Sequence, residues 1–401
     1  MRILYYSPNP NLNLHDPAGY GTHMREMIHA FRQLGHEVEV HIMGGTTPRG
    51  TGGTSQPSLF KRIAKAIIPR KHWQTMKDQR LLEFDDHAYD GLMARIQQFN
   101  PDMIYERGNY LQTSGVNAAR KMKVMHVLEM NSPYVEEKVE LEGVSRLLAK
   151  AKEKEAWQLA KTDHIVVVSS SLKEYFMAGH RIFEGKFTLI PNAIDPEKGR
   201  VEPGKLADLR RRHALEGKIV IGWVGSIQPW HGMEELILTF SNLARQDPRL
   251  ALMIVGGGET LLALKQCAAE SGVGERIHFT DGVPHAEVFT HLAAMDICVL
   301  PNTNWYGSPI KIFEYGMMGK AILATHHATV LDVMVPGQDG IVIAPGSKAL
   351  QEGLERLVAD PGLRQRLGTH FQEKVLREHT WLANARRVCE LWEFSQTSVK
   401  R

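Results

Sequence analysis

The stretch from Asn304 to Lys320 combines residues that can face an anionic ligand with residues that start a helix. Gly307 lets the backbone approach a ligand, Ser308 is a good helix N-cap, and Pro309 suits the first helical position. The unpaired amides and the positive dipole end of such a helix favour phosphate. The stretch therefore predicts a diphosphate site directly after a strand expected at Ile297–Leu300.

Lys311 and Glu314 lie three residues apart and share one face of this predicted helix. Lys311 can bring a positive charge to phosphate, and Glu314, one turn deeper, can accept hydrogen bonds from the two vicinal hydroxyls of a ribose. The alternative is that the two residues only pair with each other on the helix surface. A glycine, a helix cap and a carboxylate, here Gly307, Ser308 and Glu314, occur together after a predicted strand, and this combination favours the nucleotide interpretation.

By these residues the chain resembles retaining glycosyltransferase family 4, enzymes of the GT-B fold that use nucleotide sugars. That family carries a Glu-x7-Glu signature whose second glutamate binds the ribose, and Glu314 resembles it, whereas Tyr306 stands at the first position. The resemblance implies that backbone amides from Gly307 to Ile310 hold phosphate and sugar, and that the base rests near Val283. Further family-like segments are Ile190–Asp195, Ile254–Gly258 and Phe279–Val283.

The loop Val224–Gly232 departs from the family, which has an arginine and a lysine where this chain has Ser226 and His231. A leaving diphosphate develops negative charge and needs positive charge or hydrogen-bond donors. We therefore expect His231 to supply a donor, Lys311 to supply the full charge, and Ser226 to contact the donor substrate. The alternative for His231 is an ordinary loop or capping histidine.

In the first half of the chain, Gly19 and Gly21 match the glycine-rich loop of the family, with Gly21 expected on the donor and Gly19 on the acceptor. The alternative is a plain strand-to-helix turn. The segment lacks Gly-x-Gly-x-x-Gly, which disfavours a dehydrogenase.

Two predicted strands of the first half end in polar residues: Glu106 and Arg107 follow one, and Glu129 and Asn131 follow the other. Carboxyl ends of parallel strands are where ligands bind. Asn131 stands where many family members have a histidine that contacts the donor sugar, and it can hold a hydroxyl but cannot act as a base. Arg107 and Glu129 are acceptor-binding candidates; alternatively, Arg107 forms an ion pair with Glu106 or Glu129.

The elements that position these residues come from short apolar segments alternating with helical patterns, which predicts parallel sheets covered on both faces. The first half has strands expected at Ile3–Tyr6, Val38–Ile42, Met103–Tyr105, Val124–Leu128, Ile165–Val168 and Phe187–Ile190, and a helix over His23–Leu34. The second half has strands expected at Lys218–Val224, Leu250–Val255, Arg276–Phe279, Ile297–Leu300, Ala321–Ala324 and Gly340–Ile343.

The predicted fold class is thus α/β, and the resemblance implies GT-B: two Rossmann-like doubly wound domains facing each other across a cleft. We expect an acceptor-binding domain over 1–195, a nucleotide-sugar-binding domain over 196–380, and a helix in 381–401 that packs back on the first domain. A length of 401 residues with 43% hydrophobic residues fits two domains of roughly 150–200 residues each.

The net charge and the cysteine content indicate which partners and which cellular compartment to expect. The net charge of +3 is too small to suggest a nucleic-acid partner. Cys267, Cys298 and Cys389 are an odd number at wide spacing, which fits buried thiols in a reducing compartment. The start of the chain lacks a secretory segment and no run of about 20 apolar residues occurs, so we expect a cytoplasmic location.

Residues 59–80 carry seven cations and one anion with apolar residues interleaved. One interpretation is peripheral contact with the anionic inner face of a membrane. The other is an amphipathic helix that packs on its own domain. Before it, the glycine- and threonine-rich segment 44–58 is expected to be a mobile loop.

The sequence shows no Asp-x-Asp and no histidines at ligand spacing, so we predict no metal and no cofactor, with the nucleotide sugar as a co-substrate. Hydrolase triads are also missing from the expected contexts. The predicted function is transfer of a sugar, by default from a UDP-sugar, to a saccharide or lipid-linked acceptor, with retention implied by the resemblance. The alternatives are a nucleotide-sugar epimerase of this fold and a non-catalytic nucleotide-sugar-binding protein.

Overall fold

The computed structural model describes residues 1–16, 18–48 and 68–398 and divides into two compact units. Unit 1 contains Met1–Ile190 and Trp381–Arg401, and unit 2 contains Pro191–Thr380. The change of unit falls slightly before the expected boundary at 195, because the connecting segment bonds to unit 2. The amide of Asn192 donates to Ser308 Oγ at 3.0 Å, and the amide of Ile194 donates to the His379 carbonyl at 3.0 Å.

Unit 1 is built on a six-stranded parallel sheet of order β2-β1-β3-β4-β5-β6. The strands are β1 (Arg2–Ser7), β2 (Glu37–Ile42), β3 (Met103–Arg107), β4 (Met125–Met130), β5 (His164–Val167) and β6 (Phe187–Leu189). The inner strands are buried almost throughout, as expected for a parallel sheet covered on both faces.

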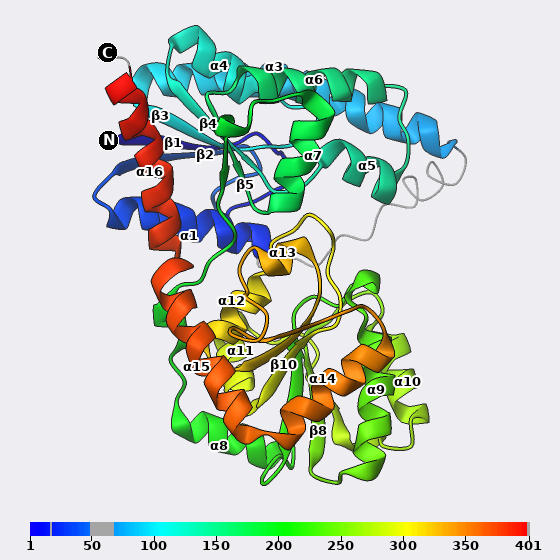
Figure 1. Cartoon of the computed structure of the whole chain (residues 1–401). Coiled ribbons are helices and arrows are strands. Elements are labelled where there is room, and N and C mark those ends of the chain that lie inside the picture. Colours follow the sequence, from blue (N-terminus) through cyan, green and yellow to red (C-terminus); the bar gives the residue numbers. More distant parts are fainter. Residues whose placement is uncertain (17, 49–67, 399–401) are drawn as a thin grey trace. The chain divides into compact units, whose positions relative to one another are not determined.

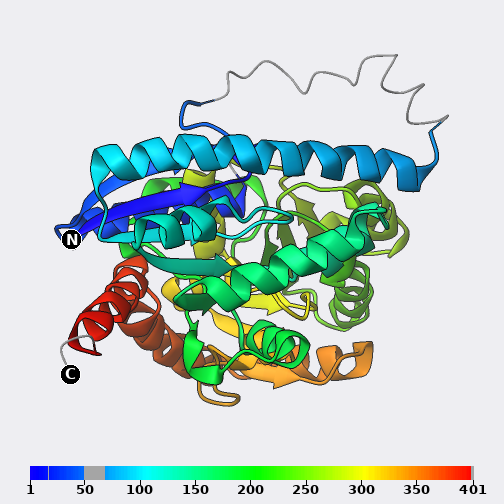
Figure 2. The same cartoon turned by 90° about the horizontal axis from the view of Figure 1, so that it is seen from above.

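Helices cover both faces of this sheet (Figure 1). They are α1 (Gly19–Gln33), α3 (Arg70–Phe99), α4 (Ser114–Met122), α5 (Tyr134–Glu142), α6 (Leu148–Lys161), α7 (Ser170–His180) and α16 (Trp381–Ser398), with a 3₁₀ turn η1 (Glu184–Lys186). α16 lies against α1, and on that face Phe31 of α1 meets Tyr105 edge-on at 5.5 Å. α3, which runs the length of the unit in Figure 2, packs Leu92 and Ile96 with α4 on the other face.

Unit 2 repeats the plan with a parallel sheet of order β12-β11-β10-β7-β8-β9. Its strands are β7 (Ile219–Val224), β8 (Leu250–Val255), β9 (Ile277–Phe279), β10 (Ile297–Leu300), β11 (Ala321–Thr325) and β12 (Ile341–Ile343). Its helices are α8 (Pro203–Arg212), α9 (Met233–Gln246), α10 (Leu261–Glu270), α11 (His285–Ala294), α12 (Ile310–Met317), α13 (Ala328–Leu331), α14 (Ser347–Ala359) and α15 (Pro361–Glu378), with 3₁₀ turns η2 (Pro196–Gly199), η3 (Pro229–His231) and η4 (Gly274–Arg276).

Each sheet has one point where the order of the strands reverses: between β1 and β3 in unit 1, and between β7 and β10 in unit 2. In doubly wound sheets, ligands bind outside the carboxyl ends of the strands at this switch point. The loops that follow β7 and β10, and those that follow β1 and β3, are therefore where sites are expected.

Some sequence predictions fall on the parts of the chain that the structure leaves undescribed. Pro17 and residues 49–67 lie outside the described residues, so most of the segment 44–58 and the first part of the basic segment 59–80 cannot be compared. Among the residues that are described, no helix is long and apolar enough to cross a membrane. Cys298 and Cys389 are buried as expected, whereas Cys267 is only partly buried.

Candidate active site

The helix start after β10 differs by one residue from the prediction. Pro309, not Ser308, is the N-cap of α12, and it provides no side-chain hydrogen bond to the first amides of the helix. Ser308 is buried and engaged elsewhere: its Oγ accepts from the Asn192 amide, and its carbonyl accepts from Asn192 Nδ2 at 2.6 Å. The amides at Ile310 and Lys311 thus begin a helix without a side-chain cap, at the switch point of unit 2.

The turn before the helix explains Gly307. Its amide donates to Asn304 Oδ1 at 2.6 Å, and a Cβ at this position would lie 2.7 Å from the same oxygen. A side chain at this position would therefore have to displace the Asn304 amide that caps the turn. The adjacent Tyr306 ring meets the Trp305 ring edge-on at 5.2 Å, and Trp305 is 43% exposed.

Lys311 is not on an open helix surface. Its Nζ lies 4.1 Å from the centroid of the Trp223 ring and 3.5 Å from His231 Nε2. Burial lowers the pKa of Lys311 to about 7, against the opposing effect of the Glu314 charge. The surface pairing of Lys311 with Glu314 that the sequence left open is not what the described residues show: Glu314, itself 9% exposed, pairs with His285 at 3.4 Å.

His231 is held as a neutral donor. Its Nδ1 accepts the Gln228 amide at 3.2 Å, so the neutral ring carries its proton on Nε2, which faces Lys311. Burial and the Lys311 charge lower the pKa of His231 to about 3. The capping role also exists, because His231 and Gln228 form the capping box of η3. Both Nε2–H and a charged Nζ are donors only, so an anion that lies beside the two nitrogens could accept from both.

Glycines bring the remaining loops of unit 2 together. A Cβ on Gly256 would lie 1.9 Å from the Gly225 carbonyl oxygen, and one on Gly258 would lie 2.0 Å from that of Ile227. Ser226 is exposed on the loop after β7, and its Oγ accepts from Gln228 Nε2 at 3.1 Å. Val283 is partly buried after β9.

In unit 1, the polar ends of β3 and β4 form a buried network. Glu129, 1% exposed, accepts at Oε1 from Arg107 Nη1 at 3.2 Å and from Asn131 Nδ2 at 2.7 Å, and His23 Nε2 lies 2.7 Å away. The ion pair expected as an alternative for Arg107 is therefore formed. Direct acceptor contact by Arg107 or Glu129 has no support in this geometry. Asn131 points its amide nitrogen at Glu129, so its carbonyl oxygen is directed away.

The network fixes the charge of Glu129. Burial raises its pKa, but His23, Arg107 and Asn131 together outweigh burial and lower the pKa to about 2. The neighbouring Glu106 points to the opposite face of the sheet, where its Oε2 lies 2.7 Å from His126 Nε2. The two glycines expected at the substrates differ in setting: Gly19 is the exposed first residue of α1, whereas a Cβ on Gly21 would meet the Asp16 carbonyl oxygen at 2.2 Å.

Sequence reasoning missed His23, Trp223 and Tyr315. Tyr315 OH accepts the Val224 amide at 2.9 Å and so ties α12 to the end of β7. His23 has a signal in the sequence, because it stands four residues before Met27 on the buried face of α1. Trp223 and Tyr315 read as ordinary core aromatics, and only their tertiary contacts reveal their place beside the site. Among the residues the structure describes, no three His, Cys, Asp or Glu side chains are placed to hold a metal ion.

Two doubly wound parallel sheets, with a helix start and convergent donors at a switch point, define the GT-B class of glycosyltransferases. HepE from Anabaena, solved in complex with UDP, has this fold, with a TM-score of 0.70 at 16% identity over 97% of this chain and 99% of its own. The model of the family described as Glycosyl transferases group 1 matches residues 207–374, and that of Glycosyltransferase Family 4 matches residues 17–198. The chain belongs to glycosyltransferase family 4.

Curated relatives match this chain only in part. A GDP-mannose-dependent alpha-(1-6)-phosphatidylinositol monomannoside mannosyltransferase of Mycolicibacterium smegmatis is 27% identical over 50% of this chain and 55% of its own length. A 2-deoxystreptamine glucosyltransferase of Streptomyces kanamyceticus is 24% identical over 52% and 54%, respectively. The chain thus spans about half the length of these relatives.

Proposed function

We propose that this glycosyltransferase moves a sugar from a nucleoside diphosphate sugar to a hydroxyl of a saccharide or lipid-linked acceptor, with retention at the anomeric carbon. The observation that carries the proposal is the pair of convergent donors, Lys311 Nζ and His231 Nε2, 3.5 Å apart beside the start of α12. Donors that face each other at a helix N-terminus suit a diphosphate.

The roles of the remaining residues follow from that placement. The Gly307 amide already donates to Asn304 and Pro309 has no N–H, so the first amides of α12, those of Ile310 and Lys311, hold the phosphates. Glu314 accepts hydrogen bonds from the ribose hydroxyls. Ser226 and Val283 lie on loops at the same sheet edge and contact the donor. Lys311 and His231 stabilise the charge on the leaving diphosphate. Asn131, with its carbonyl directed away from Glu129, accepts a hydrogen bond from a sugar hydroxyl.

None of the described residues with a role proposed above is placed as a general base, which accords with retention. In the retaining mechanism that the family resemblance implies, an oxygen of the leaving diphosphate takes the proton of the acceptor hydroxyl. The charge on that diphosphate is met here by Lys311, His231 and backbone amides, so we also propose that turnover needs no divalent metal.

We propose UDP as the nucleotide of the donor, in line with the UDP complex of HepE. The mannosyltransferase named above depends on GDP-mannose instead, so GDP is the main competitor. A thermal-shift panel of UDP, GDP, ADP and TDP sugars decides, because a ligand that binds only the folded state raises the melting temperature. We expect one nucleotide class to do so. No shift with any of them contradicts the proposal, and binding without sugar transfer or release supports the non-catalytic alternative.

We further propose that the basic segment 59–80 contacts an anionic membrane. In its described part, Lys71 and Arg80 are exposed, and so are the side chains of Met76 (46%) and Leu141 (60%). Arg70 and Lys77 are bonded to Glu142 and hold this part of the segment against α5. Cations next to exposed apolar groups suit an anionic interface. Sedimentation with vesicles of phosphatidylcholine alone or mixed with phosphatidylglycerol tests this: we expect binding only to the mixture, reduced by Leu141→Ser, and equal recovery in both supernatants contradicts it.

A further inference from the structure

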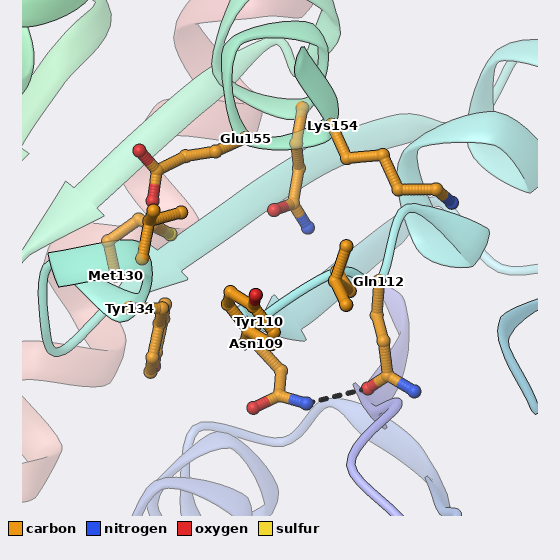
Figure 3. A pocket seen from close by; sticks show the side chains of 10 residues that line it. Asn109, Tyr110, Gln112, Met130, Tyr134, Lys154 and Glu155 are labelled. Atoms are coloured by element: carbon orange, nitrogen blue, oxygen red, sulfur yellow. Dashed lines mark hydrogen bonds between the residues drawn. The ribbon is translucent and has the colours of Figure 1, made fainter. Parts of the chain in front are cut away.

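Figure 3 shows a small pocket of unit 1 among the loop after β3, the end of β4 and the helices α5 and α6. Asn109 and Gln112 line it, and Asn109 Nδ2 donates to Gln112 Oε1 at 2.8 Å. The cavity volume is about 10 Å³, which is room for one water molecule at most. The pocket is therefore part of the packing of unit 1 and cannot hold a substrate.

In unit 2, by contrast, one indole ring contacts both side chains that are proposed to face the diphosphate. The centroid of the Trp223 ring lies 4.1 Å from Lys311 Nζ and 5.3 Å from the centroid of the His231 ring. Trp223 lies in β7 and is 0% exposed. Lys311 and His231 come from α12 and η3, so the ring on β7 is a contact that the two side chains share.

The fold fixes the approach of Lys311 to this ring. Tyr315, one helical turn after Lys311, accepts the Val224 amide with its OH at 2.9 Å. Val224 directly follows Trp223 in β7, so this bond sets the distance between helix and ring. Gly225 has φ of 144°, and a Cβ there would lie 3.1 Å from Lys311 Nζ and 3.2 Å from Trp223 Cη2. The glycine therefore keeps side-chain atoms out of the space beside the ammonium and the ring.

The surroundings of Lys311 otherwise disfavour a charged ammonium. Burial lowers the pKa of Lys311, and the charge of Glu314 raises it. The lysine also stands at the start of α12, where the helix dipole is positive, and it faces the Nε2–H of His231. The negative face of an indole attracts an ammonium, and the attraction is stronger where both groups are desolvated. Trp223 is thus a second group, besides Glu314, that favours charge on Lys311.

The indole N–H does not explain why a tryptophan stands here. Trp223 Nε1 is buried and has no hydrogen-bond partner among the described residues. A buried donor without a partner costs stability, and a phenylalanine or a leucine would fill the core without one. The other members of this core cluster, such as Met233 and Phe240, are apolar residues. The ring face towards Lys311 is what an aliphatic side chain could not supply.

We propose that Trp223 is a positioning residue: the face of its indole ring holds the Lys311 ammonium beside the diphosphate and favours its charged form. The inference rests on the proposed function, in which Lys311 meets the charge of the leaving diphosphate. It gives a core residue of β7 a part in donor recognition.

Calorimetry of the full chain with UDP-glucose, or with GDP-mannose if the thermal-shift panel selects GDP, tests this role over a range of roughly pH 5 to 9. At the acid end Lys311 is charged with and without donor, so the parent and Trp223→Leu should differ least there. At the alkaline end binding must charge the lysine without the ring. The affinity of Trp223→Leu should then be roughly 3- to 30-fold weaker than that of the parent, the effect of one cation–π contact. The pH at which affinity begins to weaken should be correspondingly lower.

The comparison does not depend on the other titratable groups that face the ammonium. These are His231 and Glu314, the latter with its partner His285, and every protein compared retains them. Trp223→Phe keeps a ring that attracts a cation less strongly than an indole, so its pH dependence should lie between those of the parent and Trp223→Leu.

Two further variants separate this role from general packing. Phe240→Leu changes another aromatic residue of the same core cluster, also 0% exposed, and should leave the pH dependence as it is in the parent. In Lys311→Met, which has no ammonium, the addition of Trp223→Leu should cause no loss of affinity that depends on pH. Circular dichroism melts verify that each variant is folded, and Trp223→Phe decides if Trp223→Leu does not fold.

Two results overturn the positioning role. One is the same pH dependence of donor affinity in the parent and in the folded Trp223 variants. The other is an equal shift in Phe240→Leu, which would assign the effect to loosened packing. If the parent binds no nucleotide sugar at any pH, the proposed function itself fails and the positioning role fails with it.

Discussion

A lysine whose ammonium is buried against an indole ring and faces a neutral imidazole is poised between its charged and neutral forms. Burial lowers the pKa of Lys311 to about 7, well below the 10.5 of an exposed lysine. A bound diphosphate stabilises the charged form, so binding is accompanied by proton uptake once the pH exceeds 7. Above pH 7, Lys311 is therefore protonated mainly when the nucleotide sugar binds.

The first prediction is a pH dependence of donor affinity. Because the protonated form binds better, affinity should be constant below pH 7 and should weaken by up to about tenfold per pH unit above it. Calorimetry with a nucleotide sugar measures this, since a diphosphate diester does not titrate in that range. Lys311→Arg, which stays charged, should remove the dependence. An unchanged slope in that variant assigns the proton to another group.

Removing the charge should affect rate and stability in opposite directions. Lys311→Met should lower turnover at saturating donor by roughly 10²–10³, the usual loss when a preorganised donor is removed. Its apolar stem keeps the packing on Trp223. Because the folded pKa is below the unfolded one, the unfolded chain holds more protons between pH 7 and 10.5, and charged Lys311 costs stability at pH 7. The variant should therefore melt no lower than the parent. Turnover within a few-fold of the parent would mean that Lys311 does not stabilise the leaving diphosphate.

At the scale of elements, the network around Glu129 joins α1 to β3 and β4. The pKa of Glu129 is about 2, below the usual 4.5. The Glu129 carboxylate therefore stabilises the fold fully above pH 4.5 and progressively loses this contribution as the pH falls towards 2. Urea unfolding of the parent and of Glu129→Gln should show a stability difference at pH 6 that narrows by pH 3. A constant difference over this range would mean that the charge of Glu129 is not what stabilises the network.

The elements also show where sequence reasoning works. In the part of the chain that the structure describes, all twelve strands overlap the segments predicted for them. Inner strands such as β8 are buried on both faces and have continuous apolar sequences, whereas β2 at the sheet edge alternates. The roles of polar residues at strand ends were harder. Side chains alternate along a strand, so the sequence alone places Glu106 and Arg107 of β3 on opposite faces of the sheet. Their partners, His126 and Glu129, follow only from the pairing of β3 with β4.

The N-cap of α12 was predicted wrongly for a related reason. Ser308 has the right type and position for an N-cap, but a tertiary bond to Asn192, more than a hundred residues away in sequence, takes its hydroxyl. Local propensity cannot anticipate such a competitor. The same holds for Lys311: one interpretation of the helical pattern left it on the surface, whereas the structure packs its ammonium on Trp223 of β7.

At the scale of the whole molecule, we propose that unit 2 carries the donor chemistry and unit 1 recognises the acceptor. Charge stabilisation by Lys311, His231 and amides predicts that turnover persists in excess EDTA, because none of the proposed phosphate contacts is a metal ion. The measurement is product formation with and without chelator, on enzyme freed of metal beforehand. Activity that vanishes and returns only with added Mg²⁺ or Mn²⁺ would refute this part of the account.

The most direct test of the central claim is release of nucleoside diphosphate from a labelled nucleotide sugar, by the parent and by Glu314→Gln, using the donor that gives the largest thermal shift. We expect steady release by the parent in the presence of a glycoside acceptor. Glu314→Gln should weaken donor binding by about 1–3 kcal/mol, as a charged hydrogen bond to the ribose becomes a neutral one. No release from any donor, or equal donor affinity in the two proteins, would contradict a nucleotide-sugar site at the start of α12.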